Sequence, residues 1–180
     1  MLGLEPMSAD RIAFMGALGA FTLITAAIDV RTRRLPNVLT VPACLLGLVF
    51  HLVVGYLHGG LTGLGGGLLF SVGGFAVGFG LFFVMWVAGS ASGGDVKFMG
   101  AIGAWLGPMP TIYVILLGAV FVLLLSILMR VWGWVQPVTD HSPGLAGWTN
   151  RYGQRVMVWG LPIALAVWSV MAYTEIWGRK

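Results

Sequence analysis

Long apolar runs recur along nearly all of the 180 residues, and few charged residues interrupt them. The chain is 58% hydrophobic and 9% charged, whereas roughly a quarter of the residues of a soluble domain are charged. A bilayer core accepts about 20 apolar residues per helix, and it tolerates only hydrogen-bonded helices or closed barrels. Because the runs are long and lack the alternation of strands, we expect an all-α, polytopic bundle of transmembrane helices. It should form a single domain over residues 1–180.

Six apolar segments are separated by polar or glycine-rich connections, the longest of which is Arg130–Arg155. They are Ile12–Ile28, Val38–Leu57, Leu61–Ala88, Phe98–Leu106, Thr111–Met129 and Val156–Tyr173. The fourth has only nine residues, which at 1.5 Å per residue reach less than half of a roughly 30 Å core. It is therefore either a short span or a re-entrant turn. The segment near the N-terminus is expected to remain as the first helix.

The distribution of basic residues favours six spans over five. With six spans the ten Lys and Arg residues divide seven to three between the two sides, and with five they divide six to four. Cytoplasmic loops carry the excess of positive charge. The larger group then faces the cytoplasm and comprises Arg31, Arg33, Arg34, Lys97, Arg130, Arg151 and Arg155.

Two acidic residues stand out because each lies where an apolar segment meets a predicted cytoplasmic loop. Asp29 ends the first segment, and Asp95 just precedes the fourth. Carboxylates at such a boundary are costly to desolvate and tend to be functional. Two carboxyls brought together can share one proton, so that one activates water and the other polarises a scissile amide. No metal or cofactor is needed. The alternative is structural: Asp29 caps loop backbone, and Asp95 pairs with Lys97 or caps the next helix.

The residues around the two acids carry a family resemblance. The first acid begins Asp-Val-Arg-Thr-Arg-Arg-Leu-Pro-Asn over residues 29–37, and the second lies in Ser-Gly-Gly-Asp-Val-Lys over residues 92–97. A third, weaker similarity is the proline-containing segment of residues 155–162. Together these resemble the type IV prepilin peptidases, the bacterial branch of the membrane aspartyl proteases with a Gly-x-Gly-Asp motif. The resemblance covers essentially the whole chain in motif order.

The resemblance implies an inner-membrane aspartic endopeptidase with Asp29 and Asp95 as its catalytic residues at the cytoplasmic face. Its substrate would be a prepilin with a short basic leader and an apolar helix. Full-length members often carry two Cys-x-x-Cys pairs and a methyltransferase activity, whereas Cys44 is the sole cysteine here. The chain is therefore similar to the short, peptidase-only branch associated with tight-adherence (Flp-type) pili, and we expect no N-methylation. It departs from the motif at Ser92, where the family has glycine.

The flanking residues are expected to support the site. Gly93 and Gly94 would permit unusual backbone angles and close substrate approach. Pro36 would hold the loop extended, and Asn37 would cap the next helix. Lys97 either keeps the carboxylate environment positive or extends toward the interface. An ordinary loop and cap is the alternative for the first four.

Two other functions remain open: a small ion-coupled transporter that uses the same acids as ligands, and a non-catalytic scaffold for pilus assembly. The expected partners are the prepilin and membrane lipid, with no nucleic acid, and homo-oligomerisation is left open. Glycines four residues apart predict close helix packing. These pairs are Gly63/Gly67, Gly74/Gly78 and Gly103/Gly107.

Overall fold

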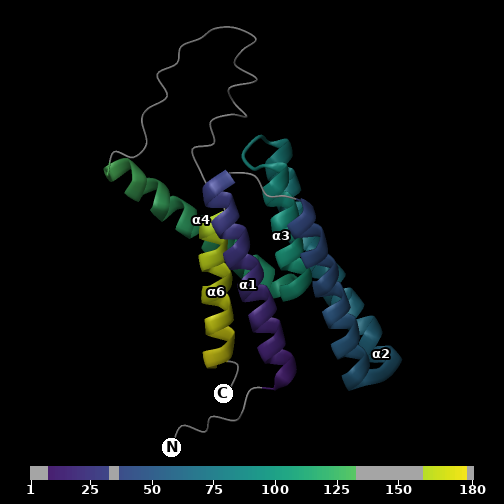
Figure 1. The fold of residues 1–180 in the computed structure, drawn as a ribbon. Helices are drawn as coiled ribbons and strands as arrows, with labels where there is room; N and C mark the ends of the chain where they lie inside the picture. Colours follow the sequence, from purple (N-terminus) through teal and green to yellow (C-terminus); the bar gives the residue numbers. More distant parts are fainter. Residues whose placement is uncertain (1–7, 33–36, 133–159, 178–180) are drawn as a thin grey trace, which may run out of the picture.

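All of the regular secondary structure in the described part of the chain is helical, as expected. The computed structural model describes residues 8–32, 37–132 and 160–177, and no strand occurs among them. The helices are α1 (Ala9–Thr32), α2 (Asn37–Val87), α3 (Gly93–Leu106), α4 (Pro108–Val131) and α6 (Gly160–Trp177) (Figure 1). The predicted start of the last segment at Val156 and most of the predicted connection Arg130–Arg155 lie outside the described residues.

Helix α2 is a hairpin of two helices rather than one rod. Gly60 interrupts it with φ 58° and ψ −139°, a left-handed backbone angle that favours glycine. A Cβ on Gly55 would collide with the carbonyl oxygen of Gly63, and one on Gly67 with that of His51. Residues eight apart in a straight helix lie about 12 Å apart, so the two halves fold back on each other. The predicted segments 38–57 and 61–88 are these halves, and the close packing predicted at Gly63 and Gly67 is confirmed.

The short fourth segment is the centre of the bundle. Helix α3 begins at Gly93 rather than at Phe98, so its 14 residues span about 21 Å. Eleven of them are buried, because α1, both halves of α2, and α4 contact or surround it (Figure 1). A helix enclosed by protein need not match the thickness of the lipid core. The break that follows is a single residue, Gly107 with φ 77°, and α4 starts directly after it.

Glycines bring the second half of α2 into backbone contact with α3. A Cβ on Gly74 would collide with the carbonyl oxygen of Gly103, and one on Gly78 with that of Met99. The close packing predicted for the Gly74/Gly78 and Gly103/Gly107 pairs is therefore confirmed.

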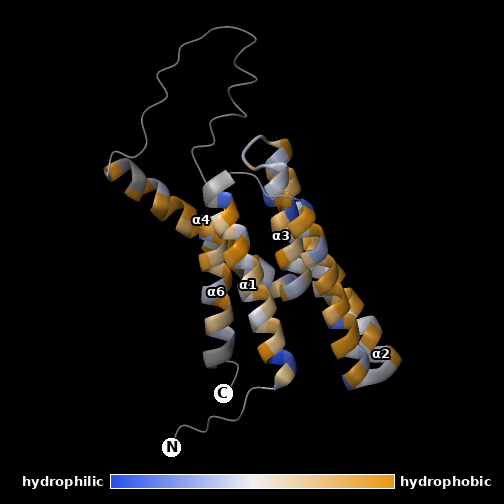
Figure 2. Ribbon diagram, viewed as in Figure 1, coloured by the Kyte–Doolittle hydropathy of each residue, from blue (hydrophilic) through white to orange (hydrophobic). Residues whose placement is uncertain are grey.

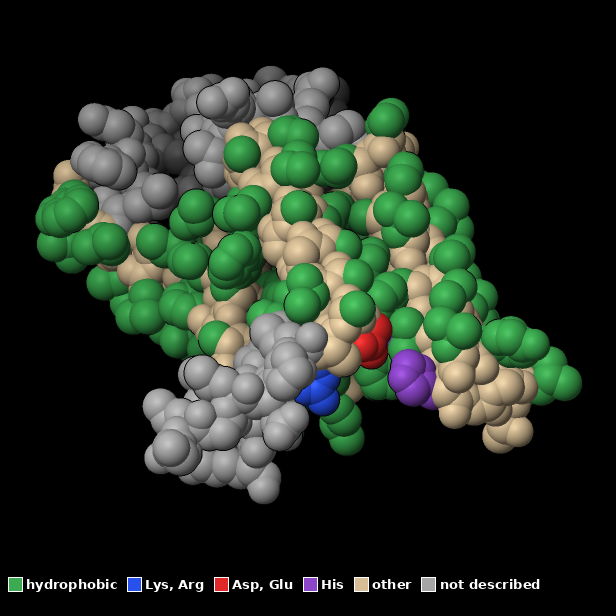
Figure 3. All heavy atoms as spheres, turned by 60° about the horizontal axis from the view of Figure 1, so that its bottom comes forward, with side chains coloured by type: hydrophobic (Ala, Val, Ile, Leu, Met, Phe, Trp, Pro, Cys, Tyr) green, Lys and Arg blue, Asp and Glu red, His purple; other side chains and the backbone are tan. Residues whose placement is uncertain are grey.

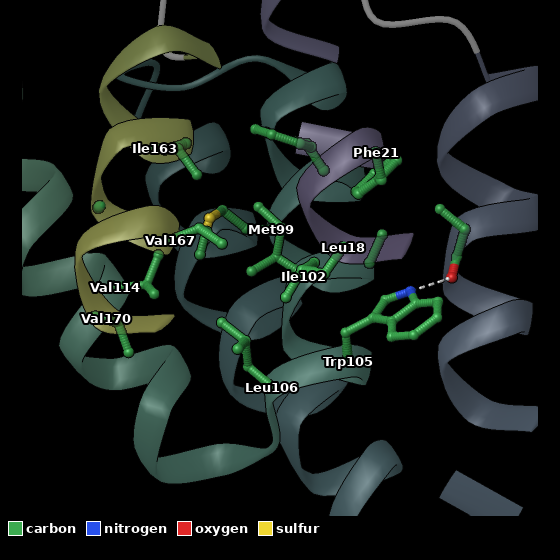
Figure 4. Close-up of a cluster of buried hydrophobic side chains, with 14 of the residues drawn as sticks. Leu18, Phe21, Met99, Ile102, Trp105, Leu106, Val114, Ile163, Val167 and Val170 are labelled. Atoms are coloured by element: carbon green, nitrogen blue, oxygen red, sulfur yellow. Dashed lines mark hydrogen bonds between the residues drawn. The ribbon is translucent and has the colours of Figure 1, made fainter. Parts of the chain in front are cut away.

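The core surrounds α3 on its other sides. Figure 4 shows side chains from α1, α3, α4 and α6 converging, and Trp105 donating its Nε1–H to the Ala43 carbonyl oxygen at 2.7 Å. Its fully buried members include Leu18, Phe98, Met99, Ile102, Ile163, Val114 and Val167.

The outward faces are apolar. Large hydrophobic side chains such as Leu69, Val84 and Leu123 are exposed. Figure 2 colours much of the helical ribbon as hydrophobic, and in Figure 3 hydrophobic side chains are spread over the described part of the visible face. Three described helices are long and apolar enough to cross a membrane: Ala9–Asp29, Asn37–Val87 and Pro108–Leu128, with Gly160–Thr174 a shorter apolar helix. The six-span count stays a prediction, although the hairpin in α2 is consistent with two passes.

Candidate active site

Asp29 lies one turn before the end of α1, which continues to Thr32 rather than ending at the acid. It shares a buried face with Leu18, Phe21 and Thr25, at intervals of three to four residues. The residue is 6% exposed, and its Oδ2 accepts a hydrogen bond from the backbone N–H of Gly160 at 2.8 Å. A carboxylate is unfavourable near a helix C-terminus but favourable at an N-terminus. The start of α6 therefore compensates for the position of Asp29 on α1.

Asp95 lies within the first turn of α3, not before the helix as the sequence had indicated. It is 2% exposed and forms a capping box with Ser92. The Ser92 N–H donates to Asp95 Oδ2 at 2.8 Å, and the Asp95 N–H donates to Ser92 Oγ at 3.1 Å. Each partner satisfies a backbone donor of the other, which holds the Asp95 side chain at the start of α3.

The two acids lie toward the same end of the bundle. Helices α1 and α3 run in opposite directions (Figure 1), and the rings of Phe21 and Phe98 pack between them with centroids 5.6 Å apart. Asp29 follows Phe21 by eight residues, and Asp95 precedes Phe98 by three. Both are thus displaced from the ring pair in one direction, by about 12 Å and about 4.5 Å along their helices.

Lys97 and Asn37 join α3 to α2 at this end. The Lys97 ammonium donates to Asn37 Oδ1 at 2.7 Å, and the contact is exposed. Asn37 is the first residue of α2. Its side-chain oxygen accepts this hydrogen bond from α3, a contact that the predicted cap did not include. Pro36 lies outside the described residues.

Gly93 and Gly94 occupy the first turn of α3. The described glycines with positive φ are Gly60, Gly89 and Gly107. The unusual backbone angles expected at Gly93 and Gly94 are therefore wrong for this structure, and the left-handed residue of the connection is Gly89.

The capping roles considered from the sequence are present for both acids: Asp95 caps α3, the next helix, as considered, whereas the partner of Asp29 differs from the expected one. Asp29 binds the N-terminus of α6 rather than a nearby loop, and nothing local in the sequence points to Gly160, which is 131 residues away. The contact of Ser92 with Asp95 is predictable from the sequence, because Ser-x-x-Asp before an apolar helix is a capping-box pattern. Both buried carboxylates are thus held by backbone donors at helix starts.

Comparison of the sequence with known proteins identifies its family. The model of the type IV leader peptidase family matches residues 16–127, which include Asp29 and Asp95. The chain belongs to this family. Three relatives are each named prepilin leader peptidase/N-methyltransferase. The protein of Escherichia coli K12 is 36% identical over 92 residues, that of Dickeya chrysanthemi 35% over 106, and that of Neisseria gonorrhoeae 33% over 117.

The matches cover part of each relative. They span 48%, 53% and 63% of this chain, but 38%, 34% and 39% of the E. coli, D. chrysanthemi and N. gonorrhoeae proteins. The chain therefore matches less than half the length of these relatives. No solved structure gives a significant match.

Proposed function

We propose that the chain is an inner-membrane aspartic endopeptidase that removes the basic leader from Flp-like type IV prepilins, with Asp29 and Asp95 as its catalytic pair. The observation that carries the proposal is the burial of both carboxyls toward one end of an apolar bundle, in a member of the type IV leader peptidase family. Buried carboxylates in a membrane protein are rare and mark functional sites.

In the proposed reaction the two carboxyls share one proton when substrate is bound. The ionised carboxylate takes a proton from water, and the water oxygen attacks the scissile carbonyl carbon. The protonated carboxyl gives its proton to the carbonyl oxygen. Collapse of the tetrahedral intermediate breaks the C–N bond, and the carboxyl that took its proton from water gives that proton to the leaving amine. A hydroxyl proton of the intermediate returns to the other carboxylate, which restores the starting pair. The apolar helix of the prepilin shares the bilayer with the enzyme, which reduces the entropy cost of placing the scissile bond.

The proposed function also requires a particular orientation of the bundle in the membrane. The end of the bundle that holds Asp29 and Asp95 would face the cytoplasm, where the prepilin leader lies before export. The two Cys-x-x-Cys pairs that often accompany methyltransferase activity in full-length members cannot form here, because Cys44 is the sole cysteine of the sequence. The peptidase activity would therefore occur without N-methylation. The mature pilin released by this chain should therefore carry an unmodified N-terminal amine, which mass spectrometry would test.

The deciding experiment is co-expression of the chain with a type IV prepilin from the same organism, followed by electrophoresis to detect loss of the leader. Asp29→Asn and Asp95→Asn should each abolish cleavage while accumulating normally in the membrane. Asp10→Asn is the matched control, because Asp10 lies at the other end of α1, and it should cleave like the wild type. Normal cleavage by either dyad variant would reject the pair. Pilus assembly that survives both substitutions would favour the scaffold, and ion flux that both abolish would favour the transporter.

A further inference from the structure

Gly160 is the residue that connects Asp29 to the last helix. It is buried at the first position of α6, and its N–H donates to Asp29 Oδ2 at 2.8 Å. Helices α1 and α6 pack along each other (Figure 1), so this hydrogen bond lies where the end of one helix meets the start of the other. The residue lies outside the segment 16–127 that the family model matches.

A side chain has no room at this position. A Cβ on Gly160 would lie 2.6 Å from Oδ2, 2.9 Å from Cβ and 3.1 Å from Cγ of Asp29. Turning the carboxylate would relieve the contact with Oδ2 but not the contact with the Asp29 Cβ, which is attached to the α1 backbone. Any residue larger than glycine must therefore displace the Asp29 side chain, the end of α1 or the start of α6.

We propose that Gly160 is a positioning residue for Asp29, through its backbone N–H and through its lack of a side chain. Every residue except proline has the N–H, but only glycine lets it approach the carboxylate from this direction without a collision. The inference rests on the proposed peptidase function, in which Asp29 is one of the two catalytic carboxyls. It adds the start of α6 to the elements that determine the geometry of the site.

The expected effect of Gly160→Ala is on the rate of the chemical step. Displacing a catalytic group by up to about 1 Å costs on the order of 100-fold, so kcat for prepilin cleavage should fall about 10- to 100-fold. KM should stay within about twofold of the wild type, because the prepilin does not have to contact Gly160. Alanine forms helices better than glycine, so weakened helix formation cannot explain such a loss.

Gly16→Ala is the matched control, since Gly16 lies on the same helix as Asp29 and a Cβ there would meet nothing within 4 Å. It should retain wild-type kcat and KM. A Gly160→Ala enzyme with kcat within twofold of the wild type, or with a loss confined to KM, would overturn the inference.

A stability measurement tests the contact independently of activity. Asp29→Ala removes the carboxylate, including two of the three closest atoms, so Gly160→Ala should lower the Tm less in that background than in the presence of Asp29. Equal losses of Tm in the two backgrounds would contradict the contact. If Gly160→Ala alone does not accumulate, adding Asp29→Gly, which removes all three of the closest atoms including Cβ, should restore accumulation, and failure to restore it would also count against the inference. An inactive wild type would reject the proposed function and, with it, a catalytic role for Gly160.

Discussion

The backbones of Gly74 and Gly103 touch across the interface of α2 and α3, and a Cβ on either would collide with the carbonyl oxygen of the other. This contact determines how deep α3 lies against the second half of α2. Asp95 precedes Gly103 by eight residues, about 12 Å along the helix. The depth of the acid therefore depends on a contact between residues that carry no side chain.

Gly103→Ala should consequently destabilise the protein. The added methyl group meets backbone rather than a movable side chain, and overpacking of this kind costs about 1–3 kcal/mol. Thermal unfolding in detergent, followed by the fluorescence of the eight tryptophans, would measure the change in Tm. Gly66→Ala is the control, because a Cβ there meets nothing within 4 Å. Equal Tm values for the two variants would show that α3 does not pack this closely.

Two substitutions of Ser92 should show whether its side chain stabilises α3 as an N-cap; one of them introduces the glycine of the Gly-x-Gly-Asp motif. Ser92→Ala removes the oxygen that accepts from the Asp95 N–H, and loss of an N-cap costs about 1 kcal/mol, whereas Ser→Gly costs a few tenths. We expect Ser92→Gly to unfold at nearly the wild-type temperature and Ser92→Ala to unfold several degrees lower. The reverse order would mean that the capping box does not stabilise α3.

The hydroxyl of Thr40 is buried and has no hydrogen-bond partner among the residues that the structure describes. An unpaired buried polar group costs about 1–3 kcal/mol. Thr40→Val, which replaces the hydroxyl with a methyl group of similar size, should leave the Tm unchanged or raise it. Thr22 is the matched contrast, since its Oγ1 donates to the Leu18 carbonyl oxygen and accepts from Trp168 Nε1. Thr22→Val should lower the Tm, and a comparable loss for Thr40→Val would reveal a partner for its hydroxyl.

The Lys97 contact with Asn37 is exposed, and exposed pairs contribute about 1 kcal/mol or less. Lys97→Met and Asn37→Ala should each change the free energy of unfolding by no more than that. The double variant should lose less than the sum of the two single variants, because both remove the same hydrogen bond. Strict additivity in urea unfolding would indicate that the contact contributes nothing to stability.

Much of the helical pattern was predictable from the sequence, because each helix depends on local composition. The apolar runs predict an all-α bundle, the gap between the segments Val38–Leu57 and Leu61–Ala88 predicts the break within α2, and the glycine pairs predict backbone contacts. The start of α3 was placed too late because Gly93 and Gly94 resemble a loop when their surroundings are ignored. The sequence also predicts unusual backbone angles at Gly93 and Gly94, whereas the structure has a positive φ at Gly89 instead.

What the sequence determined by itself is the apolar, helical character of the protein and the two acids flanked by family motifs, since these are properties of neighbouring residues. Three features follow from the packing of the helices alone: other helices enclose α3, Lys97 donates a hydrogen bond to Asn37, and the Gly160 N–H donates one to Asp29. Each of these contacts joins segments far apart in the chain. Their geometry depends on how whole helices pack, and no local pattern of residues encodes which helix end meets which carboxylate.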